Sequence, residues 1–213
     1  MRPTLPRLAA AAPDAITSGV YLTAWIAPGM VGAEGVRNLM LTMLIEFVVM
    51  HSTGFYAGLA AAKDVGRGKR VLVLTGLTAF YSLFIVGFAF AFKSSWPLWA
   101  FGWLFVSRFM HLWTRPGQDA SEDNRMFALW GVSVGAYLLG AFATVLLPLP
   151  RLGLTPEFVA SLALSGKGAW IERPHTVMAF GALYFALQAW AKYAFAATGA
   201  VPRPASPTSA SRA

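Results

Sequence analysis

Six stretches of predominantly apolar residues recur along the chain, separated by short polar segments. They cover residues 15–30, 38–62, 71–92, 96–114, 126–147 and 175–197. A helix needs about 20 apolar residues to cross the hydrocarbon of a bilayer, and most of these stretches approach or exceed that length. The pattern predicts an all-α, polytopic bundle of six transmembrane helices within residues 15–198. A five-helix alternative stays open, because the first stretch is short and ends at Pro28-Gly29.

The basic residues set the orientation of this bundle. With six crossings and both termini inside, 11 of the 17 lysines and arginines lie on the inner side and 5 on the outer side, and Arg108 is embedded. An excess of basic residues marks the cytoplasmic side. We therefore expect a multi-pass protein of the plasma (inner) membrane with residues 1–14 as a cytoplasmic tail. Residues 199–213, rich in Pro, Ser and Ala, are expected to be a disordered cytoplasmic tail.

The longest polar connection, residues 149–174, then falls on the outer side. Within it, Thr155-Pro156-Glu157 has the chemistry of a helix start: a capping hydroxyl, a proline at the first helical position and an acid at the positive end of the helix dipole. Apolar residues follow, so a short helix over about 156–165 is predicted to lie on the outer surface.

Composition agrees with a membrane protein and excludes several classes. The chain is 57% hydrophobic with a mean hydropathy of +0.57, and only 12% of its residues are charged, well below the roughly 25% of a soluble domain. Cysteine is absent, which excludes disulfides and thiolate metal sites. The net charge of +8 is spread between apolar stretches, so no nucleic-acid partner is expected.

Catalytic motifs are missing from the sequence. It contains no P-loop, no H-E-x-x-H and no G-x-G-x-x-G spacing. An ATPase and a zinc peptidase are excluded, and the sequence leans away from an enzyme without deciding the question.

Two charged residues interrupt the apolar stretches, Glu46 in the second and Arg108 in the fourth. A lone charge inside the bilayer costs several kcal/mol, so each needs a partner. At 1.5 Å per residue Glu46 lies roughly 12 Å and Arg108 roughly 18 Å along helices that run the same way. We predict an ion pair in a polar core, with His111 beside Arg108. A purely structural clamp, and a protonated Glu46 bonded to Thr42 or to another helix, are alternatives that stay open.

Further polar side chains are candidates for the lining and the outer rim of such a site. Tyr184 and Gln188 share one face of the last helix and could line the polar core. His175, preceded by Glu172 and Arg173, begins that helix at the outer rim, where a role in gating or proton uptake is the alternative to simple interfacial hydrogen bonding.

His51 completes the candidate polar core, although it points about 140° away from Glu46 around the same helix. His51 and His111 lie on different helices, which makes them candidate haem ligands; no other metal site is predicted. The glycine spacings Gly54/Gly58 and Gly131/Gly135 allow close helix contact, with a membrane-protein partner or with a second copy of the chain.

Three functions stay open at this point. The first is a small channel, carrier or sensor whose mid-membrane polar site takes a proton or a small polar solute. The second is a haem-binding membrane redox protein, and the third is an accessory subunit packed within a larger membrane complex. The charged residues within the apolar stretches favour the first.

Overall fold

The computed structural model describes residues 5–61, 65–93, 120–165 and 167–198, together with residues 95, 97–99 and 102. Every regular element in these ranges is a helix, so the predicted all-α class is confirmed. The described part holds five long helices and two short ones: α1 (Leu5–Ile26), α2 (Pro28–Ala61), α3 (Arg67–Ala91), α5 (Ala120–Leu146), α6 (Pro156–Ser161), α7 (Ala169–Glu172) and α8 (Pro174–Thr198).

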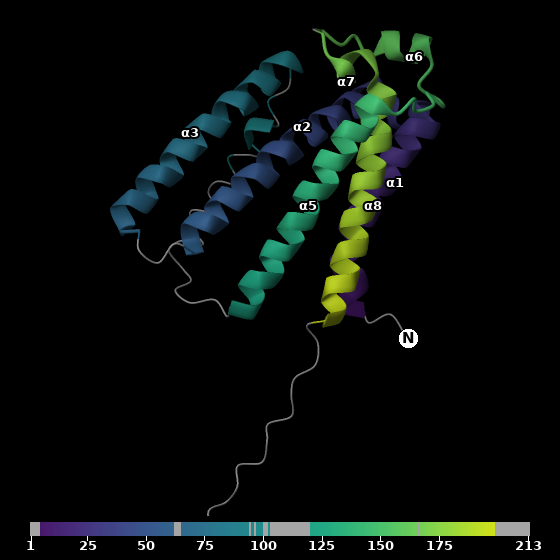
Figure 1. Cartoon of the computed structure of the whole chain (residues 1–213). Coiled ribbons are helices and arrows are strands. Elements are labelled where there is room, and N and C mark those ends of the chain that lie inside the picture. Colours follow the sequence, from purple (N-terminus) through teal and green to yellow (C-terminus); the bar gives the residue numbers. More distant parts are fainter. Residues whose placement is uncertain are drawn as a thin grey trace, which may run out of the picture.

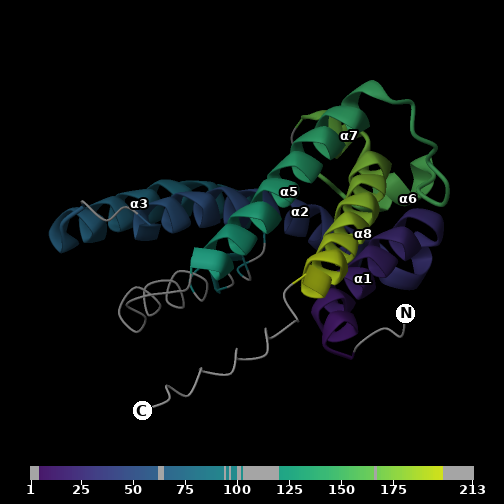
Figure 2. The same ribbon diagram turned by 60° about the horizontal axis from the view of Figure 1, so that its bottom comes forward.

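Helix α8 lies at the centre of the packing. It contacts α1 on one side and α5 on the other, and it also contacts α2, whereas α3 lies at the edge of the bundle beside α2 (Figures 1 and 2). The start of α1 and the end of α8 lie at the same end of the bundle, and α6 and α7 lie at the opposite end (Figure 1).

The helix boundaries follow the apolar stretches closely in the later helices. The predicted ranges 71–92, 126–147 and 175–197 differ from α3, α5 and α8 by no more than six residues at either end. Helix α6 begins at Pro156 as predicted, with the Thr155 side chain accepting a hydrogen bond from the Phe158 backbone, but it ends at Ser161. The α7 turn was not predicted.

The first two helices differ most from the sequence pattern. Helix α1 starts at Leu5, ten residues before the predicted stretch and inside the predicted tail. Its alanine-rich first segment favours a helix, but its apolar run is too short to be predicted as a membrane span. Helix α2 starts at Pro28 rather than near residue 38 and is interrupted at Gly32, whose φ of 79° is one that glycine adopts readily.

Two of the described helices are long and apolar enough to cross a membrane, namely Pro28–Phe55 within α2 and Gly68–Ala91 within α3. A shorter apolar segment, Ala128–Thr144, lies within α5. The predicted fourth helix, residues 96–114, falls outside the described residues except at 97–99 and 102.

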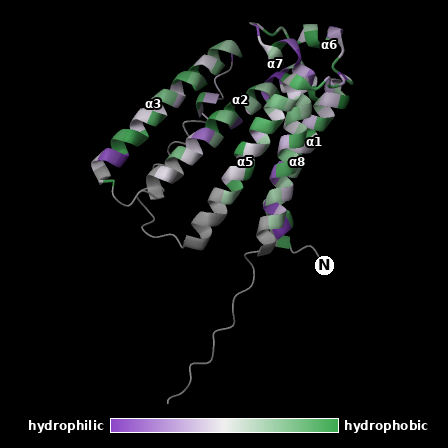
Figure 3. Cartoon of the chain, viewed as in Figure 1, coloured by the Kyte–Doolittle hydropathy of each residue, from purple (hydrophilic) through white to green (hydrophobic). Residues whose placement is uncertain are grey.

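Helix α3 is made of apolar residues along most of its length (Figure 3). Leu72, Leu83 and Phe90 are 73%, 71% and 79% exposed. The helix of a soluble core buries such side chains, because leaving them in water forfeits about 1.5–3 kcal/mol each. Residues of this kind on an outward face fit contact with lipid or with another membrane helix.

The core lies between α1, α2, α5 and α8, and glycines let these helices approach one another. A Cβ added at Gly181 of α8 would run into the ring of Tyr21 from α1, and a Cβ added at Gly140 of α5 would run into Phe180 of α8. Both rings are buried. The connection after α5 is tied to the end of α1, since the Trp25 indole donates to the Pro150 carbonyl at 2.9 Å.

Candidate functional site

A hydrogen bond between two helices joins Glu46 of α2 to Tyr184 of α8. The Tyr184 hydroxyl donates to the Glu46 carboxyl oxygen Oε1 at 2.8 Å. Tyr184 is only 1% exposed, and Glu46 is half-buried. Because water has little access to Tyr184, its hydroxyl needs a partner inside the protein, and the carboxyl supplies it.

Helix α8 extends this contact into a polar stripe. Tyr184, Gln188 and Lys192 are spaced by four residues and so lie on one face of the helix. Gln188 is buried and lies within hydrogen-bonding reach of Tyr184. Lys192 forms an ion pair with Asp14 of α1, with 2.6 Å between Nζ and Oδ2. Polar groups therefore run from Glu46 along α8 towards the end of the bundle where α1 begins and α8 ends.

Two more buried tyrosines fasten their helices to α2. The hydroxyl of Tyr21, from α1, donates to the Leu39 carbonyl at 2.7 Å. The hydroxyl of Tyr137, from α5, donates to the Met43 carbonyl at 2.8 Å. Three helices thus each place a tyrosine hydroxyl on residues 39–46 of α2. Two of these hydroxyls bond to backbone carbonyls, whereas the Tyr184 hydroxyl bonds to an ionisable side chain.

In the described part of the chain, three buried tyrosines lie around Glu46. The rings of Tyr137 and Tyr184 lie 5.5 Å apart at 82°, and both tyrosines, like Tyr21, are close enough to interact electrostatically with the carboxyl. Asp14 and Lys192 also interact with this carboxyl electrostatically. Because burying a charged carboxyl costs far more than burying a neutral one, gain or loss of a proton at Glu46 would change the free energy of this contact.

The structure brings together part of the predicted polar core. Glu46, Tyr184 and Gln188 meet between α2 and α8. Arg108 and His111 lie outside the described residues, so their pairing with Glu46 stays a prediction.

His51 is held within its own helix. Its Nδ1 lies 3.0 Å from the Phe47 carbonyl, and its ring packs on the Phe47 ring with 4.1 Å between centroids. Within the described ranges no group of three metal-ligating side chains occurs, and haem ligation by His51 and His111 stays an expectation.

The predicted outer rim has one buried and two exposed members. His175 is buried at the start of α8, close to Arg151 and the Leu149 backbone, whereas Glu172 and Arg173 are exposed. On the same side, the Thr155 side chain and the backbone N–H of Glu157 hold the pKa of the exposed Glu157 carboxyl below its usual value. These groups belong to the connection between α5 and α8 and to the start of α8.

The glycine pairs serve different purposes. An added Cβ at Gly54 would run into the indole of Trp130 from α5, and that indole donates to the Met50 carbonyl at 2.9 Å. Gly54 therefore makes room for a side chain of the same chain. At Gly58, Gly131 and Gly135 an added Cβ meets no described atom within 4 Å, so contact with a partner through those positions stays a proposal.

Sequence reasoning missed Asp14, Tyr21 and Tyr137. The available signal was on α1, where Asp14, Ser18 and Tyr21 recur with helical spacing and form one polar face. That face packs on α8, and the Ser18 hydroxyl donates to the Ala182 carbonyl at 2.7 Å.

Comparison of the chain with family models, with curated proteins and with solved structures finds no match.

Proposed function

We propose that the chain is an inner-membrane protein of six transmembrane helices, with both termini inside, that works as a small carrier, channel or sensor through a proton-binding site at Glu46. The observation that carries the functional part is the Glu46–Tyr184 hydrogen bond between α2 and α8. A carboxyl in the middle of an apolar bundle costs free energy, so its presence there points to a function. Binding and releasing a proton is the simplest chemistry for a carboxyl that accepts a hydrogen bond from a tyrosine hydroxyl.

The α8 stripe supports exchange of this proton with the inner side. Gln188 and the Asp14–Lys192 pair continue the polar surface from Tyr184 toward the ends of α1 and α8. On the other side of Glu46, the Tyr21 and Tyr137 hydroxyls donate to the Leu39 and Met43 carbonyls, among buried apolar side chains such as Phe180. Both hydroxyls are engaged by backbone carbonyls, so the α8 stripe is the route that we propose for the proton.

Infrared spectroscopy of the protein in vesicles tests the proton site. The difference spectrum between acidic and alkaline buffer is expected to contain a buried-carboxyl band that Glu46→Gln removes and Tyr184→Phe shifts in frequency. Glu34→Gln, which changes an exposed carboxyl of α2, is the matched control and should leave that band in place. A spectrum that Glu46→Gln does not change would contradict the proposal.

Thiol labelling tests the membrane topology, and the absence of native cysteine removes background. Single cysteines are introduced by Gly66→Cys, between α2 and α3, and by Ala160→Cys in α6; both positions are exposed. In intact cells an impermeant thiol reagent should label the second variant alone, and after lysis it should label both. Labelling of both in intact cells would refute the topology.

An accessory-subunit role is the second candidate, and one observation favours it. Helix α5 exposes Leu139, Phe142 and Leu146 on the side that also carries Gly131 and Gly135. Small residues beside large apolar ones are typical of contacts between membrane helices. This role would be supported if a partner copurifies in stoichiometric amount and Gly135→Leu abolishes the copurification. If no partner copurifies, the exposed face of α5 contacts lipid.

A further inference from the structure

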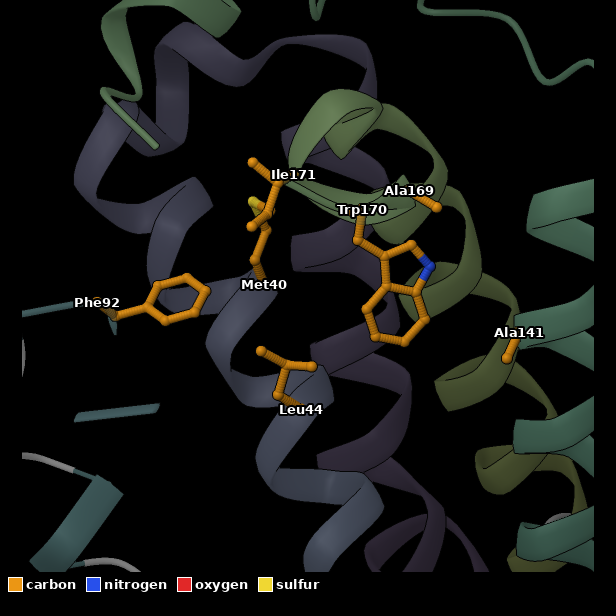
Figure 4. Close-up of a pocket in the computed structure, with 8 residues that line it drawn as sticks. Met40, Leu44, Phe92, Ala141, Ala169, Trp170 and Ile171 are labelled. Atoms are coloured by element: carbon orange, nitrogen blue, oxygen red, sulfur yellow. The ribbon is translucent and has the colours of Figure 1, made fainter. Parts of the chain in front are cut away.

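The structure holds an apolar pocket at the end of the bundle where α6 and α7 lie. The pocket has a volume of about 380 Å³, within the roughly 300–1,000 Å³ typical of small-molecule sites. Met40 and Leu44 of α2 lie between Phe92 on one side and Trp170 of α7 on the other (Figure 4). Its remaining walls come from α5 and the rest of α7, chiefly Ala141 and Ile171.

The lining is almost entirely apolar, and the pocket is partly open. The described lining offers a polar solute or an ion few hydrogen-bonding partners, so an occupant that is largely hydrocarbon fits it best. Gly168, an exposed lining residue, directly precedes α7. Its φ of 152° strongly favours glycine, and an added Cβ there would meet no described atom within 4 Å.

Basic residues are next to lining residues of the pocket in the sequence. Lys93 directly follows the lining residue Phe92, and Lys167 directly precedes the lining residue Gly168; both are exposed. Beyond Ile171 come Glu172 and Arg173, also exposed. Three positive charges against one negative charge give this rim a net attraction for anions.

We propose that this pocket binds one acyl chain of an anionic phospholipid, whose headgroup lies near Lys93 and Lys167. An apolar cavity flanked by basic residues matches both parts of such an amphiphile, since the cavity takes the hydrocarbon and the basic side chains attract the anionic headgroup. The second acyl chain would remain in the bilayer, because the pocket is open and has room for only one chain. This site is separate from Glu46 and rests only on the membrane location proposed above.

Fluorescence quenching tests the proposal, because Trp170 lines the pocket. The protein is reconstituted into vesicles of phosphatidylcholine and phosphatidylglycerol in which one lipid or the other carries brominated acyl chains. The chain has 8 tryptophans, so the Trp170 contribution is the difference between the unsubstituted protein and Trp170→Phe. We expect stronger quenching of Trp170 by brominated phosphatidylglycerol than by brominated phosphatidylcholine at equal mole fraction.

Two kinds of variant separate the chain from the headgroup. Ala141→Phe fills the pocket and should abolish the preferential quenching, whereas Leu139→Phe, on the exposed side of α5, should not. Lys93→Gln with Lys167→Gln should make the two lipids quench equally. These lysines are exposed, so this variant tests the proposal even if Ala141→Phe fails to fold.

Two failures are distinguishable. Equal quenching by both lipids in the unsubstituted protein, or preferential quenching that Ala141→Phe leaves unchanged, would overturn the lipid site. Protein that does not float with the vesicles in a density gradient would instead overturn the membrane location on which the site rests.

Discussion

Removing the Tyr184 hydroxyl tests whether Glu46 carries charge in the bundle. Tyr184→Phe deletes the donor to the Glu46 carboxyl at 2.8 Å, and Tyr137→Phe deletes a donor to the Met43 carbonyl at the same distance. The two tyrosines are 1% and 3% exposed, so water replaces neither bond. The pair therefore compares a carboxyl acceptor with a neutral acceptor in the same core.

The expected costs follow from the acceptor. Hydrogen bonds between membrane helices average about 0.6 kcal/mol and reach about 1.7 kcal/mol, and Tyr137→Phe should fall in that range. Hydrogen bonds to charged groups contribute about 1.5–3 kcal/mol, so Tyr184→Phe should lower the free energy of unfolding by about 1–2 kcal/mol more than Tyr137→Phe in alkaline buffer. In acidic buffer, where a protonated Glu46 is a neutral acceptor, that difference should disappear.

The assay is reversible unfolding in mixed micelles, followed by circular dichroism, for the unsubstituted protein, both single variants and the combination of Tyr184→Phe with Glu46→Gln. In the Glu46→Gln background the acceptor is a neutral amide, and Tyr184→Phe should then cost no more than Tyr137→Phe does. Equal costs of the two tyrosine substitutions at every pH, or additive effects of Glu46→Gln and Tyr184→Phe, would refute a charged Glu46 bonded to Tyr184.

Three further predictions use the same unfolding assay. Gly181→Ala should destabilise the protein by about 1–3 kcal/mol, because the new methyl overpacks a buried tyrosine ring. The control Gly87→Ala, whose methyl meets no described atom within 4 Å, should be neutral or stabilising. A larger loss of stability from Gly87→Ala than from Gly181→Ala would contradict the packing of α8 on α1. Glu46→Gln combined with Arg108→Gln should recover part of the stability that either change loses, whereas additive losses would dismiss the predicted ion pair. Asp14→Asn should cost about 1 kcal/mol in dilute buffer and less in high salt; a loss that salt does not change would contradict a contribution from the ion pair.

The sequence predicted the helices better than their contacts. Apolar length alone located α3, α5 and α8 to within a few residues, because a long apolar run has few alternatives to helix. Periodicity also placed Tyr184 and Gln188 on one face as possible lining of the polar core, and the structure adds the contact between Tyr184 and Glu46. It missed Asp14, because a short alanine-rich segment with a charge does not read as part of a spanning helix.

Contacts between helices escaped prediction for a different reason. Periodicity shows which residues share a face, but the partner depends on how two helices cross. Gly54 illustrates this, because its spacing with Gly58 indicated a close approach of two backbones, and the structure fills the space at Gly54 with the Trp130 indole. The hydroxyls of Tyr21 and Tyr137 reach backbone carbonyls, which every residue carries, so no sequence pattern marks their acceptors.

The acceptors of the three tyrosine hydroxyls determine how a proton at Glu46 would act. Tyr21 and Tyr137 hold α1 and α5 to α2 through carbonyls, whose bonding does not depend on pH. Tyr184 holds α8 to α2 through a carboxyl, whose strength as an acceptor does depend on its proton. Gaining or losing that proton therefore changes the strength of the hydrogen bond between α8 and α2 and leaves the hydrogen bonds of Tyr21 and Tyr137 unchanged. Because α8 also carries Lys192, which is paired with Asp14, polar contacts continue from Glu46 along α8 to α1.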